Sequence, residues 1–463
     1  MLHSRRAVGR IAVRPVPTSV FTSVLASVAF QGSRPRGAAR AAPSAADCTV
    51  ESTARRATRP APLLAARSII RGFALMVSIV ASHAYAQDSG PVPADGVYTM
   101  LVGTYTSGKS EGIYVFRFDT KTGAATQVSV AQTVNPSFLV VSRDRRFVYS
   151  VNELPGDNGP ATQRGGISAF GFDAARGQLT FLNKVSSDGN DPCYLSISAD
   201  GKYLLSANYS VAPDPGGSFA VFPLQANGWV GTSVQTVHHE GGGPVKGRQD
   251  NSHVHSTVFS PDGRYLLAQD LGADKLYSYR YAPQSSAGAG PFIATDWGYT
   301  QQKAGTGPRH LIFGADGKHA YLTSELAATV STFDYHDGRL KLVQTLPLSE
   351  PDFKGKVGAA AIHMSPDGRF VYASNRGDAN EIVIFSVDPA TGHLKQIGRQ
   401  SSLGKSPREF TVDPTGNWLI VGNQLSDTVY VFKRDPQTGL LDPNPKQHFD
   451  LGSPVDFKLV SPS

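Results

Sequence analysis

Apolar and polar residues alternate along the chain in short runs that occur in pairs, with a turn between the two runs. Around Asp316-Gly317, for example, the flanking runs HLIF and HAYLT are rich in β-branched and aromatic residues. Asp-Gly between two such runs is the strongest short-range signal for a β-hairpin with a type I′ turn. Six copies align on this turn: residues 136–153, 192–209, 254–271, 308–325, 359–376 and 407–424.

A second kind of turn recurs after the third strand of most copies. It begins with Asp, ends with Gly, and follows an alternating run such as GIYVFRF. It occurs at residues 119–123, 173–177, 334–338, 388–392 and 435–439. Each repeat therefore has four strands, and a period of about 50 residues favours radially repeated sheets over a helical solenoid.

The ends of the chain supply a seventh sheet. Residues 453–460 read as a lone first strand, while residues 98–106 and 112–118 read as second and third strands. Pairing them would close a ring and leave no exposed blade edge. We predict an all-β, seven-bladed β-propeller of four-stranded antiparallel blades, closed by pairing of the N- and C-terminal strands. A β-sandwich also uses short strands, but it does not repeat one hairpin six times.

The positive charge of the chain is concentrated before the propeller. Residues 1–86 hold 12 Arg and no Lys against two acidic residues, so the formal net charge of +7 becomes 32 − 35 = −3 for the remainder. This argues against a nucleic-acid-binding surface. Arg67 and Arg71, the apolar run 73–81 and a small-residue site ending at Ala86 have the pattern of a secretory signal peptide.

We therefore expect export to the periplasm or beyond, with cleavage near Ala86. Residues 1–86 would form a basic low-complexity extension plus the signal peptide, 87–96 a leader, and 97–463 the propeller. No run of the roughly 20 apolar residues needed to span a bilayer is present. We expect a monomer.

The aligned hairpins predict which side chains meet at one mouth of the ring. If the first strand of each blade lines the channel, its start lies at the same face as the end of the second strand. Seven residues before the turn stand Ser137, Cys193, His255, Arg309, Ala360 and Arg408. Eight after it stand Asn152, Asn208, Asp270, Ser324, Asn375 and Asn423, and nine after it Glu153, Tyr209, Leu271, Glu325, Arg376 and Gln424. The register would place Arg309 opposite Ser324 and beside Glu325.

Several of these residues also have simpler interpretations. The four Asn residues are more typical of strand-end caps than of ligand contacts, and His363 is typical of a satisfied core histidine. His253 and His255 alternate as metal ligands can, yet a third ligand is not identified, so no metal is predicted. The arginines could form inter-blade ion pairs. Cys193 is more typical of a small buried residue than of a nucleophile, because no cationic neighbour is evident from the sequence.

At these motifs the chain resembles a known family. HVHSTVFSPDG, GPRHLIFGADG followed by SEL, IHMSPDGRFVYASNR and SPREFTVD are similar to the propeller-type 6-phosphogluconolactonases, which are related to fungal 3-carboxy-cis,cis-muconate lactonizing enzymes. The resemblance covers nearly all of the mature chain. It implies a seven-bladed propeller, no cofactor, and catalytic or anion-binding positions at His255, Arg309, Glu325 and Arg376.

The chemistry of lactone opening fits these residue types. It needs an activated water, a stabiliser for the tetrahedral oxyanion and a hold on the substrate's anionic group. We prefer Glu325 as general base with His255 as its acid or oxyanion partner, and His255 as base is the alternative. Arg309 and Arg376 suit bidentate anion binding, with Arg408 as a weaker third; Asp270 is placed in the same substrate-binding set.

A small-molecule lactone is therefore the expected substrate. A non-catalytic binding propeller and a muconate-type cycloisomerase remain alternatives, because the same cationic pocket would suit each of them. Inserts at residues 154–166 and 240–251 are expected beside the mouth, where they could reshape it.

Overall fold

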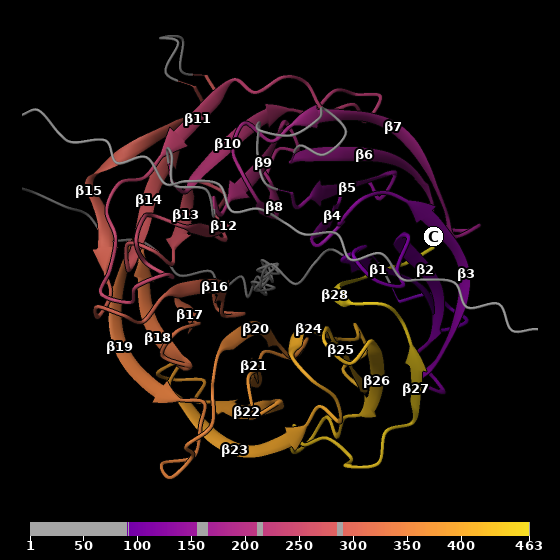
Figure 1. Cartoon of the computed structure of the whole chain (residues 1–463). Coiled ribbons are helices and arrows are strands. Elements are labelled where there is room, and N and C mark those ends of the chain that lie inside the picture. The colour runs from indigo at the N-terminus through magenta and orange to yellow at the C-terminus, as the bar shows by residue number, and fades with distance from the viewer. Residues whose placement is uncertain (1–89, 91, 155–164, 211–215, 285–289, 463) are drawn as a thin grey trace, which may run out of the picture. The chain divides into compact units, whose positions relative to one another are not determined.

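The computed structural model describes residues 90, 92–154, 165–210, 216–284 and 290–462. Within them the chain forms seven four-stranded antiparallel sheets arranged as blades around an axis (Figure 1). The predicted signal peptide, Cys48 and most of the insert at 154–166 lie outside the described residues. No helix long and apolar enough to cross a membrane occurs in the described part of the chain.

Blade 1 closes the ring as predicted. It consists of β28 (Pro454–Val460), β1 (Val97–Thr104), β2 (Gly112–Asp119) and β3 (Ala124–Gln132), so that the last strand of the chain is the innermost strand of the first blade. The register pairs Thr99 with Val460 and Leu101 with Lys458. The last strand of the described chain thus pairs directly with its first strand.

The other six blades follow in chain order, each running from the axis outward. Blade 2 is β4 (Leu139–Val141), β5 (Phe147–Asn152), β6 (Gly166–Asp173) and β7 (Gln178–Ser186). Blade 3 is β8 (Pro192–Ile197), β9 (Tyr203–Asn208), β10 (Ser218–Pro223) and β11 (Gln235–His238). Blade 4 is β12 (Val254–Phe259), β13 (Tyr265–Asp270), β14 (Lys275–Tyr281) and β15 (Phe292–Gln301).

Blades 5 to 7 complete the circle. Blade 5 is β16 (Pro308–Phe313), β17 (His319–Ser324), β18 (Thr329–His336) and β19 (Arg339–Pro347). Blade 6 is β20 (Ala359–Met364), β21 (Phe370–Asn375), β22 (Glu381–Val387) and β23 (Leu394–Ser401). Blade 7 is β24 (Pro407–Val412), β25 (Trp418–Asn423), β26 (Thr428–Lys433) and β27 (Gln447–Asp450).

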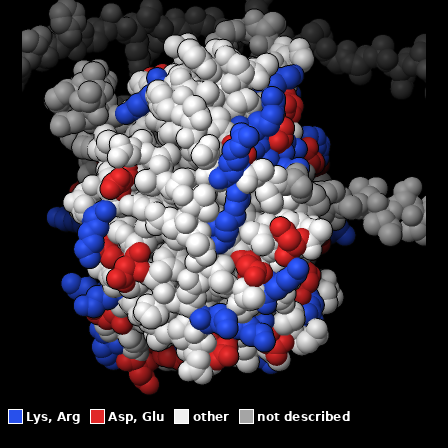
Figure 2. All heavy atoms as spheres, turned by 90° about the vertical axis from the view of Figure 1, so that its right-hand side faces the viewer, with Lys and Arg blue, Asp and Glu red and all other residues white. Residues whose placement is uncertain are grey.

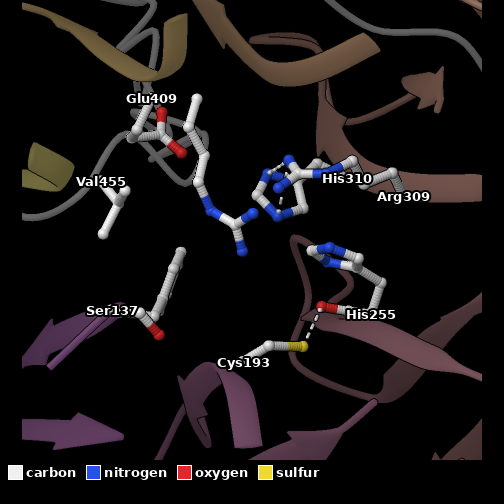
Figure 3. Close-up of a pocket in the computed structure, with 9 residues that line it drawn as sticks. Ser137, Cys193, His255, Arg309, His310, Glu409 and Val455 are labelled. Carbon is white, nitrogen blue, oxygen red and sulfur yellow. Dashed lines mark hydrogen bonds between the residues drawn. The ribbon is translucent and has the colours of Figure 1, made fainter. Parts of the chain in front are cut away.

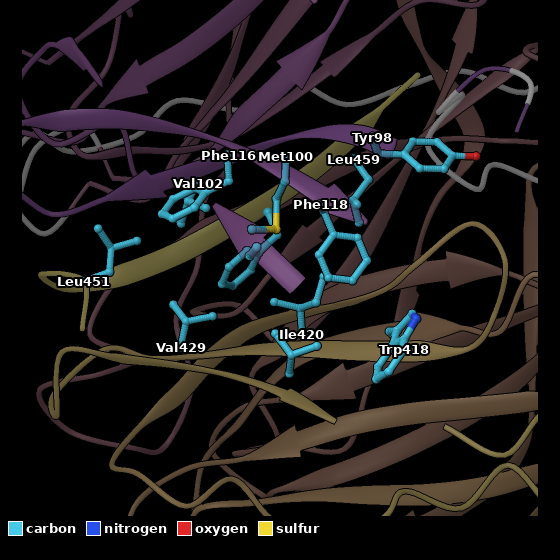
Figure 4. Packing of buried hydrophobic residues seen from close by; sticks show 13 residues of the cluster. Tyr98, Met100, Val102, Phe116, Phe118, Trp418, Ile420, Val429, Leu451 and Leu459 are labelled. Carbon is cyan, nitrogen blue, oxygen red and sulfur yellow. The ribbon is translucent and has the colours of Figure 1, made fainter. Parts of the chain in front are cut away.

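Hydrophobic packing lies between blades rather than within them. Seven buried apolar clusters occur in the described chain, one at each interface between neighbouring blades. The cluster that joins blade 7 to blade 1 packs Phe118 and Leu459 with Trp418 and Ile420 (Figure 4). Inner strands are buried on both faces because each blade has a neighbour on either side, whereas outermost strands such as β3 alternate between covered and exposed residues.

The six hairpin turns differ from the predicted type I′ form. That turn needs a positive φ at both central residues, yet only Gly317 of the Asp316-Gly317 pair has one, at 65°. The Asp316 carboxylate instead accepts a hydrogen bond from the backbone N–H of Lys318 at 2.8 Å. The turn prediction was therefore wrong in type, although the strand register that it gave holds from Phe313–Ala320 to His310–Thr323.

The glycine that ends the second turn explains how neighbouring blades fit together. Gly439 has a φ of 75°, and a Cβ built on it would lie 2.3 Å from the ring of Phe370 in the preceding blade. Gly123 meets Trp418 in the same way, at 2.6 Å. A backbone without a side chain is thus needed where the turn of one blade covers an aromatic ring of the preceding blade.

Charge is mixed on the outside of the ring. Figure 2 shows basic and acidic side chains side by side on one flank of the molecule. Local ion pairs elsewhere on the described surface include Arg264 with Asp262 at 2.6 Å and Arg369 with Asp367 at 3.0 Å. Exposed pairs of this kind contribute little to stability, so the blades depend mainly on their apolar interfaces.

We expect Gly439→Ala to lower the midpoint of urea unfolding more than Gly201→Ala does. Both glycines have a left-handed φ, of 75° and 71°, which costs another residue about 1–2 kcal/mol. A Cβ at Gly201 meets nothing within 4 Å, whereas at Gly439 it overpacks against Phe370, at a further cost of roughly 1–3 kcal/mol. Equal midpoints for the two variants would contradict this packing.

Candidate active site

A β-bulge at the start of the inner strands sets which side chains enter the channel. In β16, Pro308 pairs with Ser324 and His310 pairs with Thr323, so Arg309 has no partner across the hairpin. The prediction that Arg309 would face Ser324 was therefore wrong by one residue. Equivalent register shifts occur at Cys193, His255 and Arg408.

The bulge turns two consecutive residues toward the axis. Arg309 and His310 both line the channel pocket, as do Arg408 and Glu409. The pocket is completed by Ser137, Phe138, Cys193, His255 and Val455 (Figure 3). Residues from blades 2, 3, 4, 5 and 7 and from the ring-closing strand thus meet around one cavity, as the aligned hairpins predict.

Glu325 lies among the charged groups at the mouth and forms ion pairs with three arginines. Its Oε2 lies 2.9 Å from Nε of Arg309 and 2.9 Å from Nη2 of Arg376, and its Oε1 lies 2.5 Å from Nη2 of Arg248. Burial would raise the pKa of Glu325, but Arg376, Arg309 and Arg248 outweigh it and hold that pKa well below its usual range. The carboxylate is thus ionised, and both of its oxygens are bound by guanidinium groups. Arg376 and Glu325 belong to different blades, so the inter-blade ion pair considered from the sequence is present.

Arg309 is the most deeply buried of these cations, with 2% of its side chain exposed. Burial, together with the guanidiniums of Arg376 and Arg408, lowers its pKa to about 10. It therefore remains charged at neutral pH. Nη1 of Arg309 lies 3.4 Å from both ring nitrogens of His310, which places the imidazole beneath the guanidinium.

Arg408 forms a second charged group in the channel. Its Nη2 lies 4.0 Å from Oε2 of Glu153, and its guanidinium lies over the ring of Tyr105 at 5.4 Å. Ser137 donates a hydrogen bond to the same Glu153 oxygen. Burial opposes the charge on Arg408, but Tyr105 and Glu153 outweigh it, so the pKa of Arg408 is raised.

His255 presents a neutral imidazole to this cationic site. Its side chain is buried, and its Nδ1 has no hydrogen-bond partner among the described residues. Burial, followed by the charges of Arg309 and Arg408, lowers the pKa of His255 well below its usual value. The ring packs edge-on to Tyr209 at 5.7 Å and to His310 at 5.2 Å. It is therefore unprotonated at neutral pH.

Asp270 does not join the anion-binding set. Its oxygens accept hydrogen bonds from the Ser252 hydroxyl at 2.6 Å and from the backbone N–H groups of His253 and Ala273. It also pairs with His239 Nδ1 at 3.1 Å. A fully buried carboxylate with these partners anchors the loop before β12, so we correct its predicted role to a structural one.

The simpler interpretations fit several other residues. Asn152, Asn208 and Asn423 donate to the backbone carbonyls of Val134, Ser187 and Ser402, which confirms strand-end capping. His363 pairs with Glu409 at 2.6 Å, and His253 stacks on Tyr209. No group of three or more His, Cys, Asp or Glu residues that could hold a metal occurs in the described ranges.

Three residues at the site were not assigned from the sequence. His310 and Glu409 follow the bulged arginines, and a strictly alternating strand would have turned them away from the channel. Arg248 comes from the insert at 240–251, which was expected beside the mouth without any residue being singled out. The bulge could have been suspected from Pro-Arg at the start of β16 and β24, because proline is typical of bulges and strand starts.

This combination of fold and site defines a class of protein. A propeller channel with a neutral imidazole beside paired guanidiniums is equipped to bind an anion and to accept a proton, as a hydrolase does. Comparisons with known proteins give the family. Residues 99–459 match the family described as "Lactonase, 7-bladed beta-propeller".

Relatives of known name agree with that match. The chain is similar to the 6-phosphogluconolactonase of Bacillus subtilis, with 35% identity over 74% of this chain and 93% of the relative. It is 36% identical to the 6-phosphogluconolactonase of Formosa agariphila over 76% and 97% of the two chains. Among solved structures, the periplasmic gluconolactonase of Pseudomonas aeruginosa aligns with a TM-score of 0.76 and 45% identity, covering 79% of this chain and 100% of that one.

The chain therefore belongs to the seven-bladed β-propeller lactonase family. Its enzyme class is that of the lactonases, which hydrolyse cyclic carboxylic esters.

We expect Cys193 to be unreactive in the folded protein. Its Sγ donates to the His255 carbonyl at 3.4 Å, and burial, with Glu153 adding to it, raises the pKa of the thiol. In a chain starting at residue 87, Cys193 is the single cysteine. A disulfide reagent should label it only after denaturation, and Cys193→Ala should keep activity within about threefold because no thiolate is available. Rapid labelling of the native protein would contradict this assignment.

Proposed function

We propose that this chain hydrolyses a sugar lactone of the gluconolactone or 6-phosphogluconolactone type at the channel mouth. The family match and the names of its relatives support the reaction type. The observation that carries the proposal is the buried, neutral His255 imidazole next to the Arg309 guanidinium at one pocket.

In the proposed mechanism His255 is the general base. It accepts a proton from a water molecule as the water oxygen attacks the lactone carbonyl carbon, and Arg309 stabilises the oxyanion that forms. When the tetrahedral intermediate collapses, the bond to the ring oxygen breaks and the protonated imidazole returns its proton to that oxygen. The products are the open-chain acid and the regenerated neutral His255.

Glu325 is a weaker candidate for the base than the sequence suggested. Both of its oxygens already accept from guanidiniums, so neither is free to take a proton from a water molecule, whereas Nδ1 of His255 has no hydrogen-bond partner among the described residues. We instead propose that Glu325 is a positioning residue, which fixes Arg309 and Arg376 relative to the substrate. Arg376 and Arg408, with 16% and 18% of their side chains exposed, would bind an anionic group of the substrate.

The chain's organisation and location belong to the same proposal. Residues 1–86 would be a basic extension plus a signal peptide, and residues 97–463 would act in the periplasm or outside the cell. The similarity to a periplasmic gluconolactonase supports export. Neither a cofactor nor a partner subunit is invoked, so we expect a monomer that acts on a small-molecule lactone.

Replacing the base should abolish most of the activity. We expect His255→Asn to reduce kcat by roughly 10²- to 10⁴-fold, the usual contribution of a general base. Acid release from glucono-1,5-lactone, followed in a pH-stat and corrected for spontaneous hydrolysis, measures this effect. Circular dichroism of the variant serves as the folding control, and undiminished turnover in a folded His255→Asn protein would exclude this role.

The pH dependence should distinguish the two candidate bases. Because His255 acts in its neutral form and its pKa lies below about 6.5, kcat/KM should be level from pH 6.5 upward and decrease as acid protonates the imidazole. Glu325→Gln should lower kcat/KM by about 10- to 100-fold, the loss of a charged hydrogen bond, without moving this decrease. A profile that changes shape in Glu325→Gln but not in His255→Asn would reverse the assignment.

A further inference from the structure

The insert between β11 and β12 holds one arginine at the mouth in a fixed position. A tight turn at its tip is closed by hydrogen bonds from the backbone N–H groups of Arg248 and Gln249 to the Val245 carbonyl, at 3.1 and 2.8 Å. Gln249 is 1% exposed, and its side-chain amide donates to the Leu271 carbonyl at 2.8 Å. The base of Arg248 is therefore anchored to blade 4, although the insert is on the surface.

The Arg248 side chain extends from this turn to Glu325. Its Nη2 contacts Oε1 of Glu325 at 2.5 Å and lies 3.4 Å from the hydroxyl of Tyr209. The Tyr209 ring in turn packs against the ring of His255. Arg248 thus lies on the outer side of the residues that surround the proposed base.

Solvent access differs sharply among the guanidiniums at the mouth. The exposed fraction of the side chain is 45% for Arg248, against 2% for Arg309 and 16% for Arg376. An anion arriving from solution would therefore meet Arg248 before it met the others.

The mouth carries more positive charge than its own carboxylates balance. Arg248, Arg309, Arg376 and Arg408 face Glu325 and Glu153, while Glu409 lies deeper and is shared with His363. Each guanidinium has five N–H donors, and the two Glu325 oxygens cannot use all those of three arginines. Arg376 also donates to the carbonyls of Gly358 and Ala359. Arg248 donates only to Glu325 and to the Tyr209 hydroxyl among the described residues, so its remaining donors are left for a second anion.

We propose that Arg248 is a specificity-determining residue that contacts a phosphate or carboxylate at the end of the substrate remote from the lactone carbonyl. The inference rests on the proposed function for the orientation of the substrate, with the carbonyl at His255 and Arg309 and the remote end toward the insert. The selected substrates are then sugar lactones that carry a charged terminal carbon. Neutral lactones would bind without this contact.

The test compares open-chain products that differ only at the terminal carbon. Isothermal titration calorimetry of a chain starting at residue 87 would measure Kd for 6-phosphogluconate, glucarate and gluconate, whose terminal groups are phosphate, carboxylate and hydroxyl. The variant is Arg248→Ala. The matched control is Lys246→Ala, which removes a positive charge from the same turn, where Lys246 is exposed and the described residues offer it no ion pair.

The wild-type chain should bind at least one of the two end-charged acids more tightly than gluconate. Arg248→Ala should weaken binding of that acid by about 10- to 100-fold, as expected for a hydrogen bond between charged groups, and should change gluconate binding less than threefold. Lys246→Ala should leave all three Kd values within about twofold. The acid that the wild-type chain binds with the lower Kd identifies the preferred terminal group as phosphate or carboxylate.

Two outcomes would overturn the inference. One is equal binding of all three acids by the wild-type chain; the other is an equal loss for all three in Arg248→Ala, which would make Arg248 only a support for Glu325. Turnover of the corresponding lactones is measured separately. A chain that binds end-charged acids through Arg248 but opens no lactone would refute the proposed function and keep this inference.

Discussion

The ion pairs that the Glu325 carboxylate forms with three arginines hold the charged side chains at the mouth of this propeller in place. The carboxylate joins Arg309 of its own blade, Arg376 of the next blade and Arg248 of an insert from the other side. Removing such charges from water costs several kcal/mol per ion, and the attraction between them offsets this cost only when the ion pairs have good geometry. The seven apolar interfaces supply the rigidity, because they fix the blades and therefore the distances between charges that lie far apart in sequence.

The arginines at the mouth lower the proton affinity of both candidate bases. At the rim, guanidiniums keep the Glu325 carboxylate ionised and depress its basicity. Deeper in the channel, burial and the same positive charges keep His255 neutral. One cluster of arginines thus keeps both groups unprotonated, but it occupies both oxygens of the carboxylate, whereas Nδ1 of His255 has no hydrogen-bond partner among the described residues. The proposed choice of His255 rather than Glu325 as the base rests on this difference in hydrogen bonding, which the identity of the residues alone does not reveal.

Much of the architecture could be predicted from the sequence because the repeat is strong. Six aligned hairpins and a lone C-terminal strand predict the ring and its closure, and counting from the turn identifies His255, Arg309, Arg408 and Glu325 as neighbours. The counting assumes an unbroken ladder, however, so it misses the bulge that shifts Arg309 and brings in His310. Asp270 was misassigned because position in the repeat does not show which hydrogen bonds a carboxylate already accepts. The contact of Arg248 depends on the path of an insert that has no counterpart in the other repeats.

The central claim, that lactone chemistry takes place at the His255–Arg309 pocket, is tested most directly by a crystal structure of the chain from residue 87 with gluconate bound. The account predicts the C1 carboxylate of gluconate within hydrogen-bonding distance of both the His255 imidazole and the Arg309 guanidinium. Gluconate bound at another surface, with this pocket closed to it, would contradict the account.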